Sequence, residues 1–187
     1  MKKKNTDAGL RSNTNMRGRV QVVAVSALFC ALSIVFGKYL AISVGPVLRF
    51  SFENLPILMS GVLFGPAAGL CVGVVADLLG CVLVGYTINP IITLGAASIG
   101  LLSGLLYRLF SRLPLFLRLL FSVILSHVIG SVLIKTWGLS AFYDMPFYLL
   151  LLWRLLNYAI VGAAECAIFY YLMRHKAVKT QIERLKR

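Results

Sequence analysis

The chain has 187 residues, of which 59% are hydrophobic and 13% are charged, and its mean hydropathy is +0.87. A chain of this length cannot bury so much apolar surface in a water-soluble domain, so the composition predicts an integral membrane protein. The net charge of +13 does not indicate nucleic-acid binding, because the bases lie in tails and short loops and form no basic face on a soluble domain.

Six apolar segments predict an all-α membrane protein with six transmembrane helices, at roughly twenty residues per span. The second segment is short for a full crossing, so it is expected to begin earlier or to lie tilted. The first is interpreted as a retained helix, because it is long enough to span and no small-residue cleavage pattern follows a short core. In chain order the segments are 20–41, 54–64, 67–84, 90–109, 115–136 and 146–173, and the longer connections are 85–90, 111–114 and 137–146.

Basic tails flank the predicted transmembrane domain. This domain covers 20–173, between an N-terminal tail at 1–19 and a C-terminal tail at 174–187. Each tail carries six Lys or Arg residues, and three more lie between 108 and 118. The positive-inside rule therefore predicts that both termini are cytoplasmic, and an even number of spans agrees. The bases left for the outer half are Lys38, Arg49, Lys135 and Arg154.

The four cysteines all lie within apolar runs, and none has metal-ligand spacing. Neither a disulfide framework nor a metal site is predicted. Cysteines in such positions usually act as small core residues. They are Cys30, Cys71, Cys81 and Cys166.

Polar residues from several predicted segments fall at a similar depth, on the outer side of the membrane. A charged side chain at the centre of a span costs about 2.5 to 3.5 kcal/mol on insertion scales, so such residues are functional candidates. Their common depth predicts a polar pocket that opens outward. The candidates are Lys38, Arg49, Glu53, Asp77, Asn89, Lys135, Asp144, Arg154 and Asn157.

Several of these candidates have a structural alternative. Asp77 shares a helical stripe with Gly69, Gly73 and Gly80, which either lets another helix approach closely or leaves room for a flat ligand. Asp77 itself either binds ligand or forms a hydrogen bond between helices. Lys38 ends the first segment, and a lysine at a helix end often only anchors the helix at the interface. Arg154 lies about two turns inside the last segment, which favours function.

Two further pairs of residues leave alternatives open. Arg49 and Glu53 are four residues apart, so they either pair with each other or contact ligand. His127 and Glu165 lie away from the outer cluster and are placed outside the site. An intramembrane enzyme would need such a pair on facing helices, but without metal-ligand spacing the signal is weak.

The charges of the outer cluster define a class of ligand. Four cations and three acids make a mixed site, in which each buried charge needs a partner. A ligand with carboxylates at one end and a hydrogen-bonding ring at the other fits best. An Asp can accept two parallel N–H bonds from an amino-pyrimidinone edge, while Arg and Lys bind carboxylates. Ring faces for stacking are predicted from Trp137, Phe142, Tyr143 and Phe147.

The sequence resembles the substrate-binding S components of energy-coupling factor (ECF) vitamin transporters, and among them the folate-specific type. The resemblance covers most of the chain. It rests on six predicted helices with cytoplasmic termini and on two stretches of sequence. These are LRFSFENLPILMSGVLFGPAAGLCVGVVADLLG at 48–80 and ALFCA at 27–31.

This resemblance implies a high-affinity folate receptor in the bacterial cell membrane. It implies that ligand enters from outside, under the connections between helices one and two, three and four, and five and six. Asp77 would hold the pterin edge. Candidates for the glutamate end would be Arg49, Lys135 and Arg154, and further predicted contacts are Glu53, Asn89, Trp137 and Asn157.

The resemblance also implies partners, namely a transmembrane coupling protein and two ATPase subunits. Ala27 and Ala31 would form the docking surface for the coupling protein, on which the subunit would topple to release ligand inside. The chain has no GxxxxGK[ST] motif and no predicted cofactor, so ATP would be used by the partners. Rival interpretations are a receptor for riboflavin or biotin, or a small ion-coupled carrier, which would more often show an internal repeat.

Overall fold

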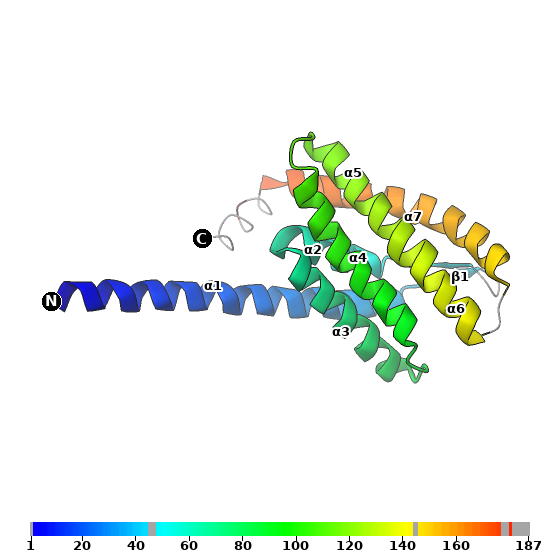
Figure 1. The fold of residues 1–187 in the computed structure, drawn as a ribbon, viewed down its shortest axis with the longest axis horizontal. Helices are drawn as coiled ribbons and strands as arrows, with labels where there is room; N and C mark the ends of the chain where they lie inside the picture. Colours follow the sequence, from blue (N-terminus) through cyan, green and yellow to red (C-terminus); the bar gives the residue numbers. More distant parts are fainter. Residues whose placement is uncertain (1, 45–47, 144–145, 177–179, 181–187) are drawn as a thin grey trace.

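Every predicted apolar segment forms a helix in the computed structural model, which describes residues 2–44, 48–143, 146–176 and 180 (Figure 1). Two of the helices contain stretches of π-helix, labelled η. The helical elements are α1 (Lys2–Ile34), η1 (Val35–Tyr39), α2 (Asn54–Phe64), α3 (Pro66–Val84), α4 (Pro90–Leu109), α5 (Leu115–Ser126), η2 (His127–Ile134), α6 (Lys135–Tyr143) and α7 (Phe147–Arg174).

Among the described residues, five helical segments are long and apolar enough to cross a membrane, and α2 is not one of them. Its 11 residues are about 16 Å long, roughly half the thickness of the hydrocarbon core. The helix ends at Gly65, whose φ of 105° is a conformation that favours glycine, and Pro66 then starts α3. The prediction of six full spans is therefore confirmed for five, and the second segment is a short helix. The five are Gly18–Tyr39, Pro66–Val84, Pro90–Leu109, Leu115–Phe142 and Phe147–Arg174.

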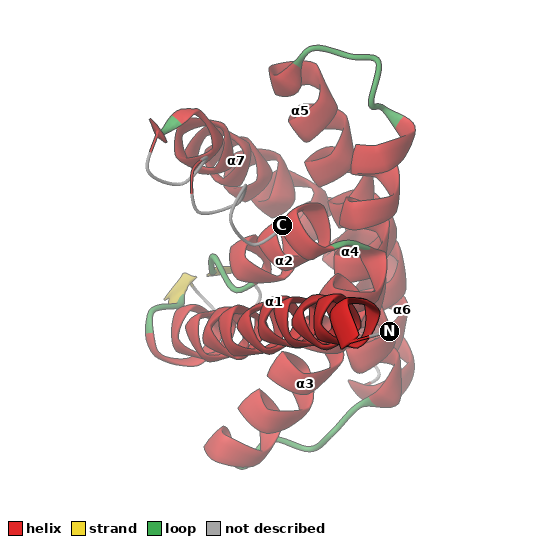
Figure 2. Cartoon of the chain, turned by 90° about the vertical axis from the view of Figure 1, so that its left-hand side faces the viewer, coloured by secondary structure: helices red, strands yellow, loops and turns green. Residues whose placement is uncertain are grey.

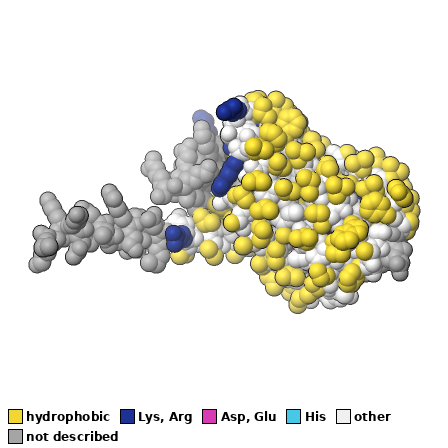
Figure 3. Space-filling view, in the orientation of Figure 1, with side chains coloured by type: hydrophobic (Ala, Val, Ile, Leu, Met, Phe, Trp, Pro, Cys, Tyr) yellow, Lys and Arg dark blue, Asp and Glu magenta, His cyan; other side chains and the backbone are white. Residues whose placement is uncertain are grey.

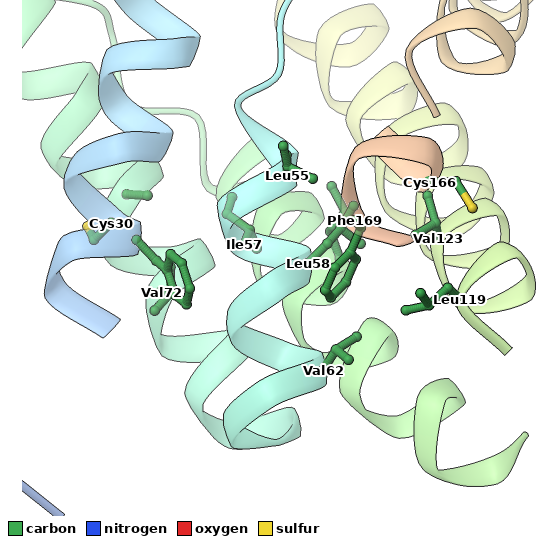
Figure 4. Packing of buried hydrophobic residues seen from close by; sticks show 13 residues of the cluster. Cys30, Leu55, Ile57, Leu58, Val62, Val72, Leu119, Val123, Cys166 and Phe169 are labelled. Carbon is green, nitrogen blue, oxygen red and sulfur yellow. The ribbon is translucent and has the colours of Figure 1, made fainter. Parts of the chain in front are cut away.

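The short α2 lies in the middle of the bundle. Most of its residues are buried, and Leu58 is fully so. Figure 4 shows α2 between α1 and α7, with Leu58 beside Phe169 of α7. A helix that is covered by others on most sides contacts little lipid, so it does not need the length of a span.

The outer surface of the bundle is apolar, as expected for a protein in lipid. Figure 3 shows one face covered almost throughout by hydrophobic side chains, with the visible Lys and Arg side chains at one end. The first residues of α1 and the last of α7 lie toward the same end of the bundle (Figure 1). The cytoplasmic location of that end stays a prediction.

Helices α3 and α4 are held together by glycines. A Cβ at Gly100 would collide with the carbonyl group of Gly69, and one at Gly73 would collide with the carbonyl of Ala96. Gly80 faces Lys38 of η1 instead. At Gly69 and Gly73 the stripe thus serves close helix packing, and the hypothesis that it leaves room for a ligand is wrong there, because the backbone of α4 already fills the space.

Replacing Gly100 by valine is expected to destabilise the fold by about 3 kcal/mol, because the side chain would meet backbone that cannot rotate away. Thermal unfolding of the detergent-solubilised protein measures this effect. Gly18→Val is the matched control, since no atom lies within 4 Å of a Cβ at Gly18. Equal melting temperatures for the two variants would contradict the packing described for α3 and α4.

The fifth predicted helix is longer than expected. Residues 137–146 were predicted to form a connection, but α5, η2 and α6 form one continuous helical rod that reaches Tyr143. The stretch from Trp137 to Tyr143 contains no proline, and the single Gly138 is tolerated within a helix. The prediction of a loop at Trp137 is therefore wrong.

Two short strands depart from the purely helical prediction. Between η1 and α2, β1 (Ile42–Val44) pairs antiparallel with β2 (Leu48–Phe50), and Ser43 lies opposite Arg49. Strand β2 contacts α7, and Figure 2 shows the hairpin at the edge of the bundle, beside the end of the first helix. At the other end of the first helix, α1 begins at Lys2, so the predicted N-terminal tail is largely helical.

Candidate functional site

Charged residues from four parts of the chain meet around Lys135, the first residue of α6. The Lys135 side chain is buried, and its ammonium group donates a hydrogen bond of 3.3 Å to Oε1 of Glu53. The Lys135 side chain packs over Gly95 of α4, two residues after the Thr93 that bonds Asp77 of α3, and Arg154 of α7 bonds the Ser131 carbonyl one turn before Lys135. The structure therefore brings together four of the predicted site residues.

Lys38 belongs to the edge of the same cluster. A Cβ at Gly80 would lie 2.9 Å from Cε of Lys38, so this side chain lies over α3, the helix that carries Asp77. The ammonium group of Lys38 lies 5.1 Å from the ring centre of Tyr86, which is a cation–π contact. Both interpretations of Lys38, as an interfacial anchor and as part of the site, stay predictions.

Asp77 is held by a side chain of the neighbouring helix. The Thr93 hydroxyl on α4 donates a hydrogen bond of 2.6 Å to Oδ2 of Asp77. The same hydroxyl lies 3.2 Å from the carbonyl oxygen of Asn89. The structural interpretation of Asp77 is therefore correct in part, because the residue does link two helices. Its partial exposure leaves it able to meet a ligand as well.

Glu53 is fixed in place by the first helix. The Ser33 hydroxyl donates a hydrogen bond of 2.7 Å to the Glu53 carbonyl, and a Cβ at Gly37 would lie 2.7 Å from Oε2 of Glu53. The predicted alternative partner of Glu53 was Arg49. The side chain of Arg49 lies outside the described residues, so both the pairing and the contact of Arg49 with ligand stay predictions.

Two polar residues of the last helix face the bundle. The Arg154 guanidinium donates a hydrogen bond of 2.7 Å from Nη1 to the Ser131 carbonyl of η2. Asn157, one turn further along α7, is buried. Arg154 therefore contacts η2, the segment directly before Lys135, whereas a place of Asn157 near Lys135 stays a prediction.

Asn89 has a clear structural role. Its side-chain oxygen caps α4 by accepting hydrogen bonds from the backbone N–H groups of Ile91 and Ile92. Its amide nitrogen donates to the Gly138 carbonyl on α6, at 3.1 Å. These bonds tie the connection before α4 to the helix that carries Lys135. A contact of Asn89 with ligand stays a prediction.

The aromatic residues predicted to stack on a ligand lie less favourably for ligand contact than the charged residues around Lys135. Trp137 is 59% exposed and lies two residues after Lys135, about 200° further around the helix. Phe142 is 50% exposed, and Phe147 packs edge-on against Tyr148. The side chains of Tyr143 and Asp144 lie outside the described residues. The structure thus does not bring Trp137 to the Lys135 cluster, and its stacking on a ligand stays a prediction.

The two alanines predicted to dock a partner lie on the outside of α1. Ala27 and Ala31 are both exposed, and Leu28 between them is 58% exposed. Together with Val35 they form an apolar face without large side chains at the alanine positions. Such a face permits close approach of another helix.

Sequence reasoning missed several residues of the cluster. Thr93 could have been found, because it lies four residues after Asn89 on the same face of a helix that begins at Pro90. Ser131 contributes a backbone carbonyl, which leaves no signal in the sequence. His127 and Glu165 were recognised as unusual, but their direct contact was not predicted; their atoms Nε2 and Oε2 lie 2.5 Å apart.

Comparison with known proteins places the chain among transporter components. The family model of the substrate-specific component of ECF transporters matches residues 21–173. The chain is 39% identical over 62 residues to the folate transporter FolT of Clostridium novyi (strain NT), a match that spans 33% of this chain and 36% of that relative.

Solved structures of similar fold cover most of the chain. A crystal structure of FolT bound with folic acid matches with a TM-score of 0.67 at 25% identity, over 80% of this chain and 90% of that one. The S component of a bacterial ECF transporter matches with a TM-score of 0.64 at 20% identity, over 83% and 95%. The second match concerns the fold alone.

Proposed function

The chain belongs to the family of ECF transporter substrate-specific components, which are membrane proteins, and we propose that it captures folate outside the cell and delivers it inward. Within this family, the observation that best supports folate as the ligand is the charge cluster around Lys135. The similarity to FolT, including a structure of FolT bound with folic acid, supports the same ligand.

The chemistry of the cluster suits the two ends of folate. Lys135 and Arg154 supply cations for the glutamate carboxylates, and the arginine can bind a carboxylate through two parallel hydrogen bonds. Asp77 supplies acceptors for the N–H groups of the amino-pyrimidinone edge of the pterin ring. Thr93 orients Asp77 by its hydrogen bond to Oδ2, so that Oδ1 can meet the ligand.

Glu53 has a separate part in this proposal. It neutralises the buried Lys135 before ligand arrives, since an unpaired charge in this place would be costly. A ligand carboxylate would then share Lys135 with Glu53 or replace it. Arg49 and Asn157 are proposed to complete the glutamate end. Asn89 and Trp137 are retained as candidate contacts.

Delivery requires partners in this proposal. The exposed alanine face of α1 would dock a transmembrane coupling protein through Ala27 and Ala31. Two ATPase subunits bound to that protein would supply the energy by hydrolysing ATP. The end of the bundle that carries the two tails would face the cytoplasm, as the positive-inside rule predicts, and the Lys135 cluster would face outward.

Equilibrium binding to the purified protein in detergent tests the ligand. Folate, pteroate (which lacks the glutamate), riboflavin and biotin are compared. We expect tight binding of folate, about tenfold or more weaker binding of pteroate, and none of the other two, because charge-assisted hydrogen bonds to the glutamate are lost in pteroate.

Other outcomes of this experiment would change the proposal in defined ways. Binding of riboflavin or biotin without folate would keep the family and replace the ligand. Equal affinity for folate and pteroate would show that the glutamate of folate does not bind Lys135 and Arg154. Absence of any vitamin binding would contradict the proposed function.

A further inference from the structure

A second buried polar group lies outside the Lys135 cluster and has no part in the proposed ligand contacts. His127 on η2 and Glu165 on α7 are 2% and 0% exposed, and Nε2 of His127 lies 2.5 Å from Oε2 of Glu165. Oε1 of Glu165 has no hydrogen-bond partner among the described residues. Burying such a pair within a membrane span costs free energy, so the pair is a candidate for a functional role.

The pair is connected to the ligand cluster through a chain of contacts. Nδ1 of His127 lies 3.4 Å from the Ser131 hydroxyl, and the Ser131 carbonyl accepts the 2.7 Å hydrogen bond from Arg154. The ring of His127 also stacks on Tyr158 at 4.9 Å between ring centres. Helix α7 therefore holds η2 at two levels, at Glu165 and about three turns earlier at Arg154.

These contacts fall on a segment whose geometry needs support. Residues His127–Ile134 form a π-helix, which is rare and is often found at functional sites. A π-helical turn contains one more residue than an α-helical turn. If one such turn became α-helical, all following residues would rotate by about 100° around the helix axis. The next residue after η2 is Lys135. The register of η2 thus decides whether the Lys135 side chain points toward Glu53 or away from it.

We propose that His127 and Glu165 are positioning residues for the carboxylate end of the ligand, acting through the register of η2. His127 begins the π-helical segment, and its bond to Glu165 fixes that end against α7. The Ser131 carbonyl then meets Arg154, and Lys135 meets Glu53. This inference rests on the proposed function, because it assigns the two cations to the glutamate of folate.

A positioning role predicts a loss confined to one end of the ligand. In His127→Leu, which removes both ring contacts at similar volume, folate affinity is expected to fall about tenfold or more. Pteroate affinity is expected to stay within about twofold, because the Asp77 end is held by α3 and α4. A residue that served only general stability would lower the affinity for both ligands together.

Conservative variants test the chemistry of the contact. His127→Gln can place a donor where Nε2 stands, and is expected to keep most of the folate affinity. His127→Asn reaches only the position of Nδ1 and is expected to behave like His127→Leu. Ser126→Ala is the control, since Ser126 is the buried neighbour of His127 and its hydroxyl has no partner among the described residues.

Chemical rescue offers an independent measurement. A cavity of about 290 Å³ reaches His127 and Tyr158 between η2 and α7. Free imidazole can therefore enter the space left in His127→Ala, and it is expected to restore folate affinity. Unchanged folate affinity in His127→Ala before imidazole is added would overturn the proposal, and so would a loss that imidazole does not restore.

The outcomes separate this inference from the proposed function. If the unaltered protein binds no folate, the proposed function fails and the inference fails with it. If it binds folate but His127→Leu weakens folate and pteroate equally, only the inference fails. Should His127→Leu not fold, His127→Asn decides by the same comparison of the two ligands, and equal loss of folate and pteroate affinity again overturns the inference.

Discussion

Replacing Asp77 by asparagine is expected to weaken folate binding by about ten- to a hundredfold, while the protein stays folded. Asparagine keeps the shape of the side chain and can still accept the hydrogen bond from Thr93. Its amide nitrogen, however, would then face the N–H groups of the pterin edge, and a donor cannot bond to a donor. Hydrogen bonds to a charged group are worth about 1.5 to 3 kcal/mol, which sets this range.

Titration of folate into the purified variant in detergent measures this loss, and its melting temperature reports the fold. Pteroate should lose as much affinity as folate, because both ligands carry the pterin ring. Thr93→Ser is the matched control that keeps the hydroxyl, whereas Thr93→Val removes it and should reproduce part of the loss. Unchanged folate affinity in the asparagine variant would return Asp77 to a purely structural role.

Replacing Ala31 by tryptophan is expected to abolish folate uptake and to leave folate binding unchanged. Ala31 is exposed on α1, away from the Lys135 cluster, so a large side chain there meets lipid and not the interior of the bundle. In the complex, however, the same side chain would keep the coupling protein at a distance, because small residues allow two helices to pack closely.

The measurement pairs uptake by cells that contain the coupling protein and ATPases with binding to the purified subunit. Ala167→Trp is the matched control, since Ala167 is an exposed alanine on α7 outside the proposed docking face. Uptake should survive in this control. Loss of binding together with uptake in the Ala31 variant would contradict the docking role of this face.

Much of the helical architecture could be predicted, because a chain in lipid has few alternatives. Every backbone polar group must be satisfied within the membrane, so a long apolar run becomes a helix. The predicted segments 67–84 and 90–109 agree with α3 and α4 to within one residue. Pro66 and Pro90 explain this accuracy, since proline is well suited to the first turn of a helix.

The errors arose where distant contacts override local signals. The stretch after Lys135 resembles an interfacial loop, but the Gly138 carbonyl accepts a hydrogen bond from Asn89, 49 residues away, and α6 continues. Similarly, the glycines of α3 are compatible with either a ligand or a helix. Only the position of α4 shows that Gly69 and Gly73 face a backbone.

By itself, the sequence determined three properties: that the chain lies in a membrane, at which residues most of its helices begin and end, and which charged residues within the spans are functional candidates. These properties depend on composition and on local spacing. The tertiary structure alone decided the partners: Glu53 pairs with Lys135, 82 residues away, and His127 with Glu165, 38 residues away. Such pairs depend on how helices rotate and pack against each other, and spacing along one helix carries no information about that rotation.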